Sequence, residues 1–274
     1  MGPIGVFDSG YGGLTVLNEL LKKFPNYDFT YLGDNARSPY GGRSFDVVYK
    51  YTLEAVETLF SQGCHLVILA CNTASAKALR TIQQKNLPLI DTNRRVLGVI
   101  RPVVEMLGVC TKTRKVGILG TIGTVTSNSY PLEINKLFPD IKTVQEACPM
   151  WVPIVENNEF LSEGADYFVK KNIQNIFERE PEIDTLVLGC THYPLLLPTI
   201  KKYVPENVRI ITQGSIVAES LWDYLQRHHE MDMKCSKNRK HNFYTTENPE
   251  KFNQSASLFM GNDVMATHLD FLGL

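Results

Sequence analysis

The sequence lacks the features that mark several large classes of protein. Its 274 residues include only 14 prolines and 19 glycines, which excludes a fibrous chain and disfavours a disordered one. No apolar run approaches the roughly 20 residues needed to cross a membrane. Basic residues number 28 and acidic residues 29, so the positive excess that is typical of nucleic-acid binding is absent. We therefore expect neither a membrane nor a nucleic acid as partner.

Two further absences concern location and metals. The first residues, MGPIGVFDSGYGG, contain no basic patch followed by an apolar core, so we expect no signal peptide and a cytoplasmic chain. The six cysteines stand at positions 64, 71, 110, 148, 190 and 235 without a CxxC pair. This spacing suits neither a zinc site nor a disulfide framework. We expect reduced thiols, no metal and, for most of the six, a buried structural role.

What the sequence does contain is an alternation of short apolar runs and longer helical patterns. Buried strands are expected at 4–7, 29–32, 66–70, 116–119, 141–144, 185–188 and 208–211. Apolar residues at helical spacing predict helices at 15–24, 45–60, 74–84, 128–138, 167–178, 196–203 and 216–228. The alternation predicts an α/β fold with a mainly parallel sheet, in which ligands bind beyond the carboxyl ends of the strands.

A weak internal repeat divides the chain into two similar halves. The segments HLVILACNTAS at 65–75 and DTLVLGCTHYP at 184–194 each run a buried strand into a small residue, a cysteine and polar residues. Upstream of each, 5–15 and 116–126 lead a strand into glycine-rich polar sequence. Two such halves could face each other across a cleft, although any two α/β units look partly alike.

Cys71 and Cys190 are the candidates for chemistry. Each is predicted at the start of a helix, where N–H groups and the helix dipole favour a thiolate over a thiol. Asp8 and His192 could receive a proton from a thiol or tune its pKa. Polar residues that suit a carboxylate ligand follow the two cysteines: Asn72, Thr73, Thr191 and His192. Helix capping alone would also explain these polar residues, and a turn would explain Asp8.

Two polar segments have a simpler interpretation. GDNARSPYGGRS at 33–44 follows the second strand, and a turn accounts for its composition. RHHEMDMKCSKNRKH at 227–241 is partly basic, and we interpret it as a solvated connection.

At the level of motifs, the sequence resembles the bacterial glutamate racemases. The motifs that carry the resemblance are VFDSGYGGLTV, GDNARSPYG, ACNTAS, GTIGTVTSNSY, CPMWVPIVE and LGCTHYPLL, in the family's order between residues 6 and 197. FYTTENPEKF at 243–252 is similar to the family's closing segment. The resemblance implies a cofactor-independent isomerase that takes glutamate as its small-molecule substrate and supplies D-glutamate for peptidoglycan synthesis. It also implies that the chain can form a homodimer.

The same resemblance implies a domain organisation and a set of site residues. Residues 1–99 with 213–274 would form one α/β lobe and 100–212 the second, with the active site in the cleft between them. Cys71 and Cys190 would be the catalytic pair, with Asp8, His192 and Glu156 assisting the thiols. The positions that match substrate-holding residues are Asp8, Ser9, Tyr40, Gly41, Asn72, Thr73, Thr121, Thr124, Thr191 and His192.

One segment departs from the family pattern. Family members run a short apolar strand directly into the glycine that precedes the second lobe, whereas here 87–90 is separated from Gly98 by DTNRRVL. We interpret 91–97 as an insertion at the lobe crossing. Arg94 and Arg95 within it are expected to be solvated, and Arg101 stands where an acidic residue is common.

Two cysteines suit the inversion of an α-carbon, because one group must remove a proton from one face and another must return one to the opposite face. An unperturbed thiol, with a pKa near 8.5, is only a few per cent ionised at pH 7, so we expect a moderately lowered thiol pKa. Three alternatives remain. The chain could racemise aspartate or another amino acid, act as a single-cysteine hydrolase or acyl transferase, or bind an acidic ligand without turnover.

Overall fold

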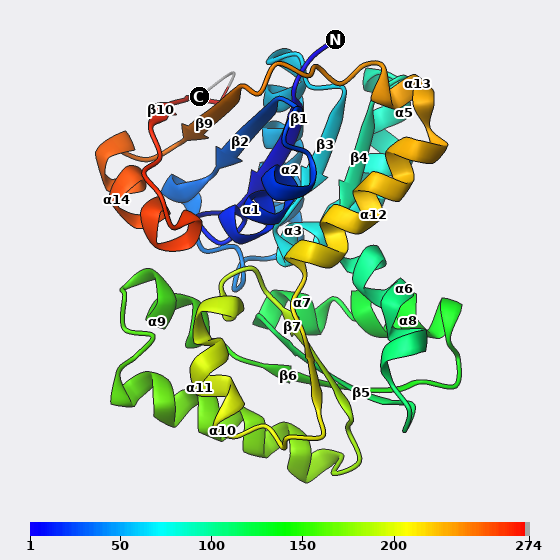
Figure 1. Ribbon diagram of the computed structural model, residues 1–274, viewed down its shortest axis with the longest axis vertical. Coiled ribbons are helices and arrows are strands. Elements are labelled where there is room, and N and C mark those ends of the chain that lie inside the picture. The colour runs from blue at the N-terminus through cyan, green and yellow to red at the C-terminus, as the bar shows by residue number, and fades with distance from the viewer. Residues whose placement is uncertain (272–274) are drawn as a thin grey trace.

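The computed structural model describes residues 1–271 and contains two parallel sheets, which lie one above the other in Figure 1. The upper sheet has six strands in the order β10-β9-β2-β1-β3-β4, and the lower sheet has four in the order β6-β5-β7-β8. The upper strands are β1 (Ile4–Asp8), β2 (Phe29–Gly33), β3 (Leu66–Leu69), β4 (Arg95–Gly98), β9 (His241–Thr245) and β10 (Ala266–His268). The lower strands are β5 (Lys115–Gly120), β6 (Lys142–Ala147), β7 (Thr185–Gly189) and β8 (Arg209–Ile211).

Helices cover both faces of each sheet (Figure 1). Those around the upper sheet are α1 (Leu14–Lys23), α2 (Phe45–Ser61), α3 (Asn72–Lys77), α4 (Leu79–Thr81), α5 (Leu87–Ile90), α12 (Gly214–Arg227), α13 (His229–Asp232) and α14 (Pro249–Met260). Those around the lower sheet are α6 (Ile100–Cys110), α7 (Ile122–Thr126), α8 (Ser129–Leu137), α9 (Trp151–Glu156), α10 (Glu163–Arg179) and α11 (Leu197–Lys201). Short 3-10 helices span Asn35–Arg37 and Tyr193–Leu196, and a π-helical turn spans Ile82–Asn86.

The strands are apolar throughout because helices bury them on both sides. Val6 and Ile68 point into the core that contains the buried faces of α1, α12 and α14. Their neighbours Phe7 and Leu69 point the other way, into the core that contains the buried face of α2. Alternate residues of a strand face opposite sides, so a strand between two helical layers needs an unbroken apolar run.

The two sheets repeat one topology. In the upper sheet β1 pairs with β2 and β3, and β3 pairs with β4. In the lower sheet β5 pairs with β6 and β7, and β7 pairs with β8 in the same order. Thus β3 and β7, the strands that precede Cys71 and Cys190, occupy equivalent positions. This confirms the predicted two-lobe α/β fold with mainly parallel sheets.

We propose that the lobes divide as the resemblance implies, into residues 1–99 with 213–274 and residues 100–212. Every strand of the lower sheet falls between 100 and 212, and every strand of the upper sheet falls outside that range among the described residues. The chain passes from one sheet to the other between β4 and α6, and returns between β8 and α12.

Several elements differ from the sequence-based expectation. The helix expected at 74–84 is broken into α3, α4 and the π-helical turn, and the helix expected at 196–203 begins with 3-10 geometry. Strands β4, β9 and β10 and helices α6, α9 and α14 were not anticipated. The missed strands are short and partly exposed, so their sequences lack the continuous apolar run of the central strands.

Residues 91–97, which we interpret as an insertion at the lobe crossing, divide between a loop and strand β4. Residues Leu87–Ile90, which stand in place of the family's apolar strand, form the helical turn α5. The strand is β4, which pairs with β3 and runs through Val99 into α6 without a break. The loop at 91–94 therefore joins α5 to an edge strand that leads directly into the lobe crossing.

Two charged segments are less solvated than expected. The Arg94 guanidinium donates to the carbonyl oxygens of Phe60 (2.6 Å) and Cys64 (3.0 Å), so Arg94 is a structural residue. The 227–241 connection contains α13, and its Met231 and Cys235 are buried. Apolar residues within a polar run anchor this segment to the core.

Candidate active site

Cys71 and Cys190 line a single cavity between the two lobes. Cys71 follows β3 of the upper sheet and Cys190 follows β7 of the lower sheet, and each is 6% exposed. The cavity has a volume of ≈ 220 Å³. Its lining is formed by Ser9, Ser38, Pro39, Tyr40, Gly41, Gly42, Cys71, Asn72, Thr73, Thr121, Ile122, Cys148, Pro149, Val152, Pro153, Cys190, Thr191 and His192. The structure thus brings the two sequence-predicted thiols to one site from opposite lobes.

Cys71 is held in a buried setting that favours its protonated form. Its sulfur lies 3.5 Å from the Ser9 hydroxyl and 3.5 Å from the Ala74 backbone nitrogen, so Cys71 caps α3. Burial and then the negative charge of Asp8 raise the pKa of Cys71 to about 12. The expected lowering of the thiol pKa is therefore wrong for this cysteine, because burial outweighs the donors of a six-residue helix.

Cys190 has a different neighbour, the imidazole of His192. The Cys190 sulfur lies 3.9 Å from His192 Nδ1, and His192 Nε2 lies 3.1 Å from the Glu156 carboxylate at the end of α9. Burial lowers the pKa of His192, but hydrogen bonds and opposite charges from Cys190 and Glu156 outweigh it and raise that pKa to about 10. At neutral pH an imidazolium therefore lies beside the Cys190 sulfur. The cysteine precedes a turn and a 3-10 helix rather than the expected α-helix.

Asp8 lies behind the cavity wall, fully buried at the end of β1. Its carboxylate accepts hydrogen bonds from the Gly10 backbone (2.9 Å) and from the Thr191 hydroxyl (3.4 Å). Burial raises the pKa of Asp8, and the positive charge of His192 partly opposes this effect. Asp8 thus contacts the second lobe while its charge acts on Cys71.

Threonine hydroxyls gather where the lobes meet. Thr73 Oγ1 of α3 lies 2.9 Å from Thr121 Oγ1, which follows β5. Thr121 also lies 3.1 Å from Thr124 Oγ1, and its oxygen accepts from the Thr124 backbone. Thr124 is fully buried behind Thr73 and Thr121, so it contacts the cavity through them.

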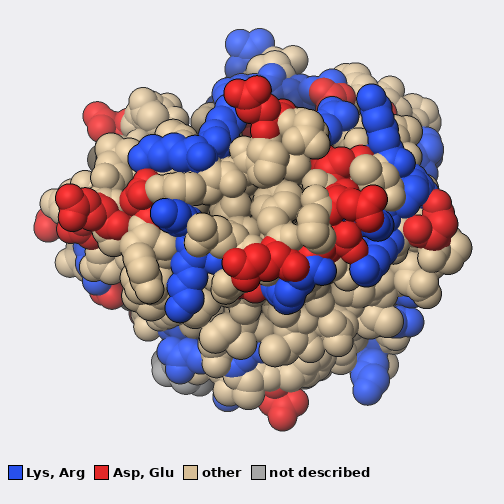
Figure 2. All heavy atoms as spheres, turned by 90° about the horizontal axis from the view of Figure 1, so that it is seen from below, with Lys and Arg blue, Asp and Glu red and all other residues tan. Residues whose placement is uncertain are grey.

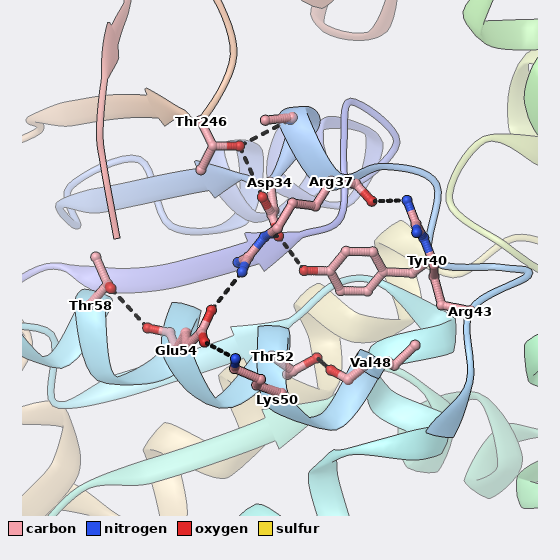
Figure 3. A network of polar contacts seen from close by, with 11 residues as sticks. Asp34, Arg37, Tyr40, Arg43, Val48, Lys50, Thr52, Glu54, Thr58 and Thr246 are labelled. Carbon is pink, nitrogen blue, oxygen red and sulfur yellow. Dashed lines mark hydrogen bonds and ion pairs between the residues drawn. The ribbon is translucent and has the colours of Figure 1, made fainter. Parts of the chain in front are cut away.

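Tyr40 lines the cavity, but its hydroxyl points away from it. The hydroxyl donates to the Asp34 carboxylate, which also pairs with Arg37 at 2.7 Å (Figure 3). Arg37 in turn pairs with Glu54 of α2 at 2.6 Å. This network fixes the loop that carries Tyr40 and Gly41, and it leaves the loop backbone as the polar surface that faces the cavity.

Sequence reasoning missed two polar residues next to the site, Tyr130 of α8 and Gln213 before α12. Both hydrogen-bond to the side chain of Asn72. Gln213 lies just beyond the carboxyl end of β8. Ligands of parallel sheets bind beyond such strand ends, so its position in the sequence could have indicated a role at the site. Tyr130 lies within a helical pattern, and no local signal distinguishes it from a core tyrosine.

Three further features of the described residues concern membranes, metal ions and surface charge. Within residues 1–271 no helix is long and apolar enough to cross a membrane, and no group of three histidine, cysteine or acidic side chains is arranged to hold a metal ion. Basic and acidic side chains are interspersed over the face shown in Figure 2. That distribution agrees with the near-neutral net charge.

Comparisons with known proteins give a consistent result. A family model described as Asp/Glu/hydantoin racemase matches residues 25–221. The glutamate racemase of Enterococcus faecalis is 39% identical over 273 residues, which cover 98% of this chain and 96% of that protein. The crystal structure of glutamate racemase isoform RacE1 from Bacillus anthracis matches with a TM-score of 0.89 and 35% identity, covering 98% and 97% of the two chains. The Francisella tularensis glutamate racemase, solved with D-glutamate, matches with a TM-score of 0.85 and 31% identity, covering 99% and 97%.

The chain therefore belongs to the Asp/Glu/hydantoin racemase family, a class of isomerases. Within that family it groups with the glutamate racemases, as its motifs suggested.

Proposed function

We propose that this chain interconverts L- and D-glutamate by passing protons between Cys71, the substrate α-carbon and Cys190. The observation that carries the proposal is that the two sulfurs line one cavity and come from opposite lobes. A substrate held between them presents one face of its α-carbon to each sulfur.

The reaction balances with the two cysteines alone. One thiolate takes the α-proton and becomes a thiol, and the electron pair left on the α-carbon is delocalised into the adjacent carboxylate. The opposite thiol then donates its proton to the other face and becomes a thiolate. After one turnover the two cysteines have exchanged protonation states, so the enzyme is ready for the other enantiomer.

The surroundings of the two sulfurs support unequal starting states. The raised pKa of Cys71 keeps that residue a thiol. The His192 imidazolium, paired with Glu156, provides a counter-charge for a thiolate on Cys190. The resting enzyme would thus hold the acid at Cys71.

The difficult step is the charge that builds on the substrate carboxylate. Hydroxyls of Ser9, Thr73, Thr121 and Thr191 line the cavity and are suited to donate to it. A well-placed donor contributes roughly 3 kcal/mol to such a transition state, so several are needed. Burial of the cavity strengthens each of them by excluding water.

The remaining site residues receive more specific roles. Asp8 tunes Cys71 by its charge, while Thr124 supports Thr73 and Thr121. Tyr40 and Gly41 offer their backbone, because the Tyr40 hydroxyl is bound to Asp34. Asn72 likewise has its amide engaged by protein groups, so it acts through its backbone or by fixing its neighbours.

The test is to replace the two cysteines separately. Cys71→Ala and Cys190→Ala should each lose racemisation of both enantiomers by at least roughly 10²–10⁴-fold, the usual contribution of a positioned proton-transfer group. Cys110→Ala, which changes a cysteine away from the cavity, is the matched control and should keep full activity. Racemisation is followed by circular dichroism in heavy water, together with deuterium uptake at the α-carbon. Full activity in either cysteine variant would overturn the two-base assignment, and trapping of an acyl-enzyme would favour a hydrolase.

The setting of the enzyme is part of the proposal. We infer that it works in the cytoplasm and makes D-glutamate for peptidoglycan, and its six unpaired cysteines suit a reducing compartment. We also infer a homodimer, which the exposed apolar side chains Met106 and Val109 of α6 support. Light scattering coupled to size-exclusion chromatography tests the assembly, and a monomer mass would contradict it.

A further inference from the structure

We infer that Tyr130 and Gln213 are positioning residues, which hold Cys71 and Cys190 at the separation that proton transfer needs. The inference rests on the proposed two-base function and adds two residues that touch neither substrate nor sulfur. It is built on a buried ring of hydrogen bonds beside the cavity.

The ring begins at Asn72, the residue after Cys71. Asn72 Nδ2 donates to Gln213 Oε1 at 2.6 Å, and Gln213 Nε2 donates back to Asn72 Oδ1 at 2.7 Å. The Tyr130 hydroxyl donates to Asn72 Oδ1 at 2.9 Å, and its oxygen accepts from Gln213 Nε2 at 2.6 Å. All three side chains are buried, so water cannot replace these bonds without opening the lobes.

The other side of Tyr130 reaches the second cysteine. Gly189 directly precedes Cys190, and a Cβ built on Gly189 would lie 3.3 Å from Tyr130 Cε2. The tyrosine ring therefore packs closely on the backbone of Gly189. Through its hydroxyl and its ring, Tyr130 contacts the chain neighbours of both cysteines.

The three residues also belong to parts of the fold that move separately if the lobes open. Asn72 begins α3 in the upper lobe, Tyr130 lies in α8 of the lower lobe, and Gln213 lies at the second crossing between the sheets. A ring closed across these elements sets their mutual distance. A displacement of about 1 Å between reacting groups can slow a reaction roughly 10²-fold.

Loss of the ring has a consequence that general destabilisation does not have. With the sulfurs misaligned, one thiolate still removes the α-proton, but the opposite thiol donates slowly. The first thiol then exchanges its proton with solvent and returns a deuteron to the same face. The substrate gains deuterium in heavy water without inverting.

The experiment compares Tyr130→Phe, Gln213→Leu and the control Tyr203→Phe in heavy water. Tyr130→Phe keeps the aromatic side chain packed on Gly189 and removes only the hydroxyl, while Tyr203 contacts Asp166 and does not line the cavity. Each protein is incubated with one glutamate enantiomer, the enantiomers are separated, and α-deuterium is measured in recovered substrate and in product.

We expect racemisation by Tyr130→Phe and Gln213→Leu to fall roughly 10- to 100-fold. The ratio of deuterium in recovered substrate to deuterium in product should rise above the ratio of the wild type and of Tyr203→Phe. An unchanged deuterium ratio in both variants, whatever their rate, overturns the inference. Loss of folded protein cannot imitate the expected result, because it lowers the deuterium in substrate and in product together and leaves their ratio unchanged. Absence of racemisation in the wild type would instead overturn the proposed function.

Discussion

The backbone N–H of Gly123 donates a 2.7 Å hydrogen bond to the carbonyl oxygen of Gly41. Gly41 belongs to the loop that Asp34 and Tyr40 hold against the upper lobe, and Gly123 lies in α7 of the lower lobe. The bond therefore joins the lobes directly at the wall of the cavity. It shows the lobes in contact beside the cavity that the two cysteines line.

This contact leaves no room for a side chain on Gly123. A Cβ there would lie 2.9 Å from the Gly41 carbonyl oxygen and 3.0 Å from Thr73 Cγ2. We expect Gly123→Ala to hold the lobes apart and to lower kcat/KM about 10- to 100-fold. Gly164→Ala is the matched control, because a Cβ on Gly164 meets only the Ser162 hydroxyl, at an ordinary 3.5 Å, and Gly164 does not line the cavity. Steady-state kinetics with both enantiomers measure the effect, and equal kcat/KM in the two alanine variants would contradict it.

A pH dependence of stability follows from His192. The folded protein raises the pKa of His192 from its ordinary 6.5 to about 10, through Cys190 and Glu156 against the opposing effect of burial. Because the fold favours the protonated imidazole, the resulting stabilisation is complete below pH 6.5 and is lost as the pH rises through 10. We expect the melting temperature of the wild type to fall between pH 7 and 10, and to fall less in His192→Asn.

Glu156→Gln provides the companion measurement. It removes the carboxylate 3.1 Å from His192 Nε2, so the pKa of His192 should decrease and the fall in melting temperature should begin at lower pH. The imidazole resonances followed by NMR across the same range report the pKa directly. A profile of melting temperature against pH identical to that of the wild type would show that Glu156 does not stabilise the His192 imidazolium.

The two cysteines that line the cavity could be predicted because their signals are local. Each cysteine directly follows an apolar strand, and the chain position of a strand end is visible in sequence. The pKa of Cys71 could not be predicted, since it depends on burial and on Asp8, which comes from another strand. Tyr130 and Gln213 were missed for a similar reason, because they lie 58 and 141 residues from their partner Asn72.

The fold was predictable in its central strands and less so at its edges. Strands β1, β3, β5 and β7 are buried on both faces, which requires apolar runs that are easily recognised. Strand β4 lies at the edge of its sheet, and of its four residues only Val96 is buried. The same segment shows why Arg94 was misjudged, since the carbonyl oxygens that it binds come from the end of α2 and the loop after it.

Arg94 offers a test of that structural role. Its guanidinium donates to two carbonyl oxygens and stacks 4.8 Å from the centre of the Phe60 ring. Arg94→Ala should lower the free energy of unfolding by about 1–3 kcal/mol, because buried acceptors lose their donor. The exposed Arg80 is the control, and Arg80→Ala should change stability by less than about 0.5 kcal/mol. Urea unfolding measures the free energy of unfolding of both variants. An unchanged value for Arg94→Ala would show that Arg94 is solvated, as the sequence predicted.

Asp28 provides the sharpest test of how the C-terminal segment is attached. One carboxylate oxygen accepts from the Asn238 and Lys240 backbone (2.8 and 2.9 Å), and the other accepts from the side chains of Ser236 and Asn238 (2.5 and 2.8 Å). Burial would raise the pKa of Asp28, but these hydrogen bonds lower it to about 2. They fix the segment just before β9, which pairs with β2.

Asp28→Asn should therefore destabilise the protein in a pH-dependent way. An amide presents only one acceptor oxygen, so its NH₂ group would face donors, and we expect a loss of about 1–3 kcal/mol at pH 7. Because the folded pKa lies below the ordinary 3.8, the stabilisation by the carboxylate is complete above pH 3.8 and is lost as the pH falls through 2. The difference in free energy of unfolding between wild type and Asp28→Asn should thus shrink as the pH falls from 4 towards 2. The exposed Asp223, changed to Asn, should show no such convergence, and a constant difference for Asp28→Asn would mean that the carboxylate charge does not hold the segment.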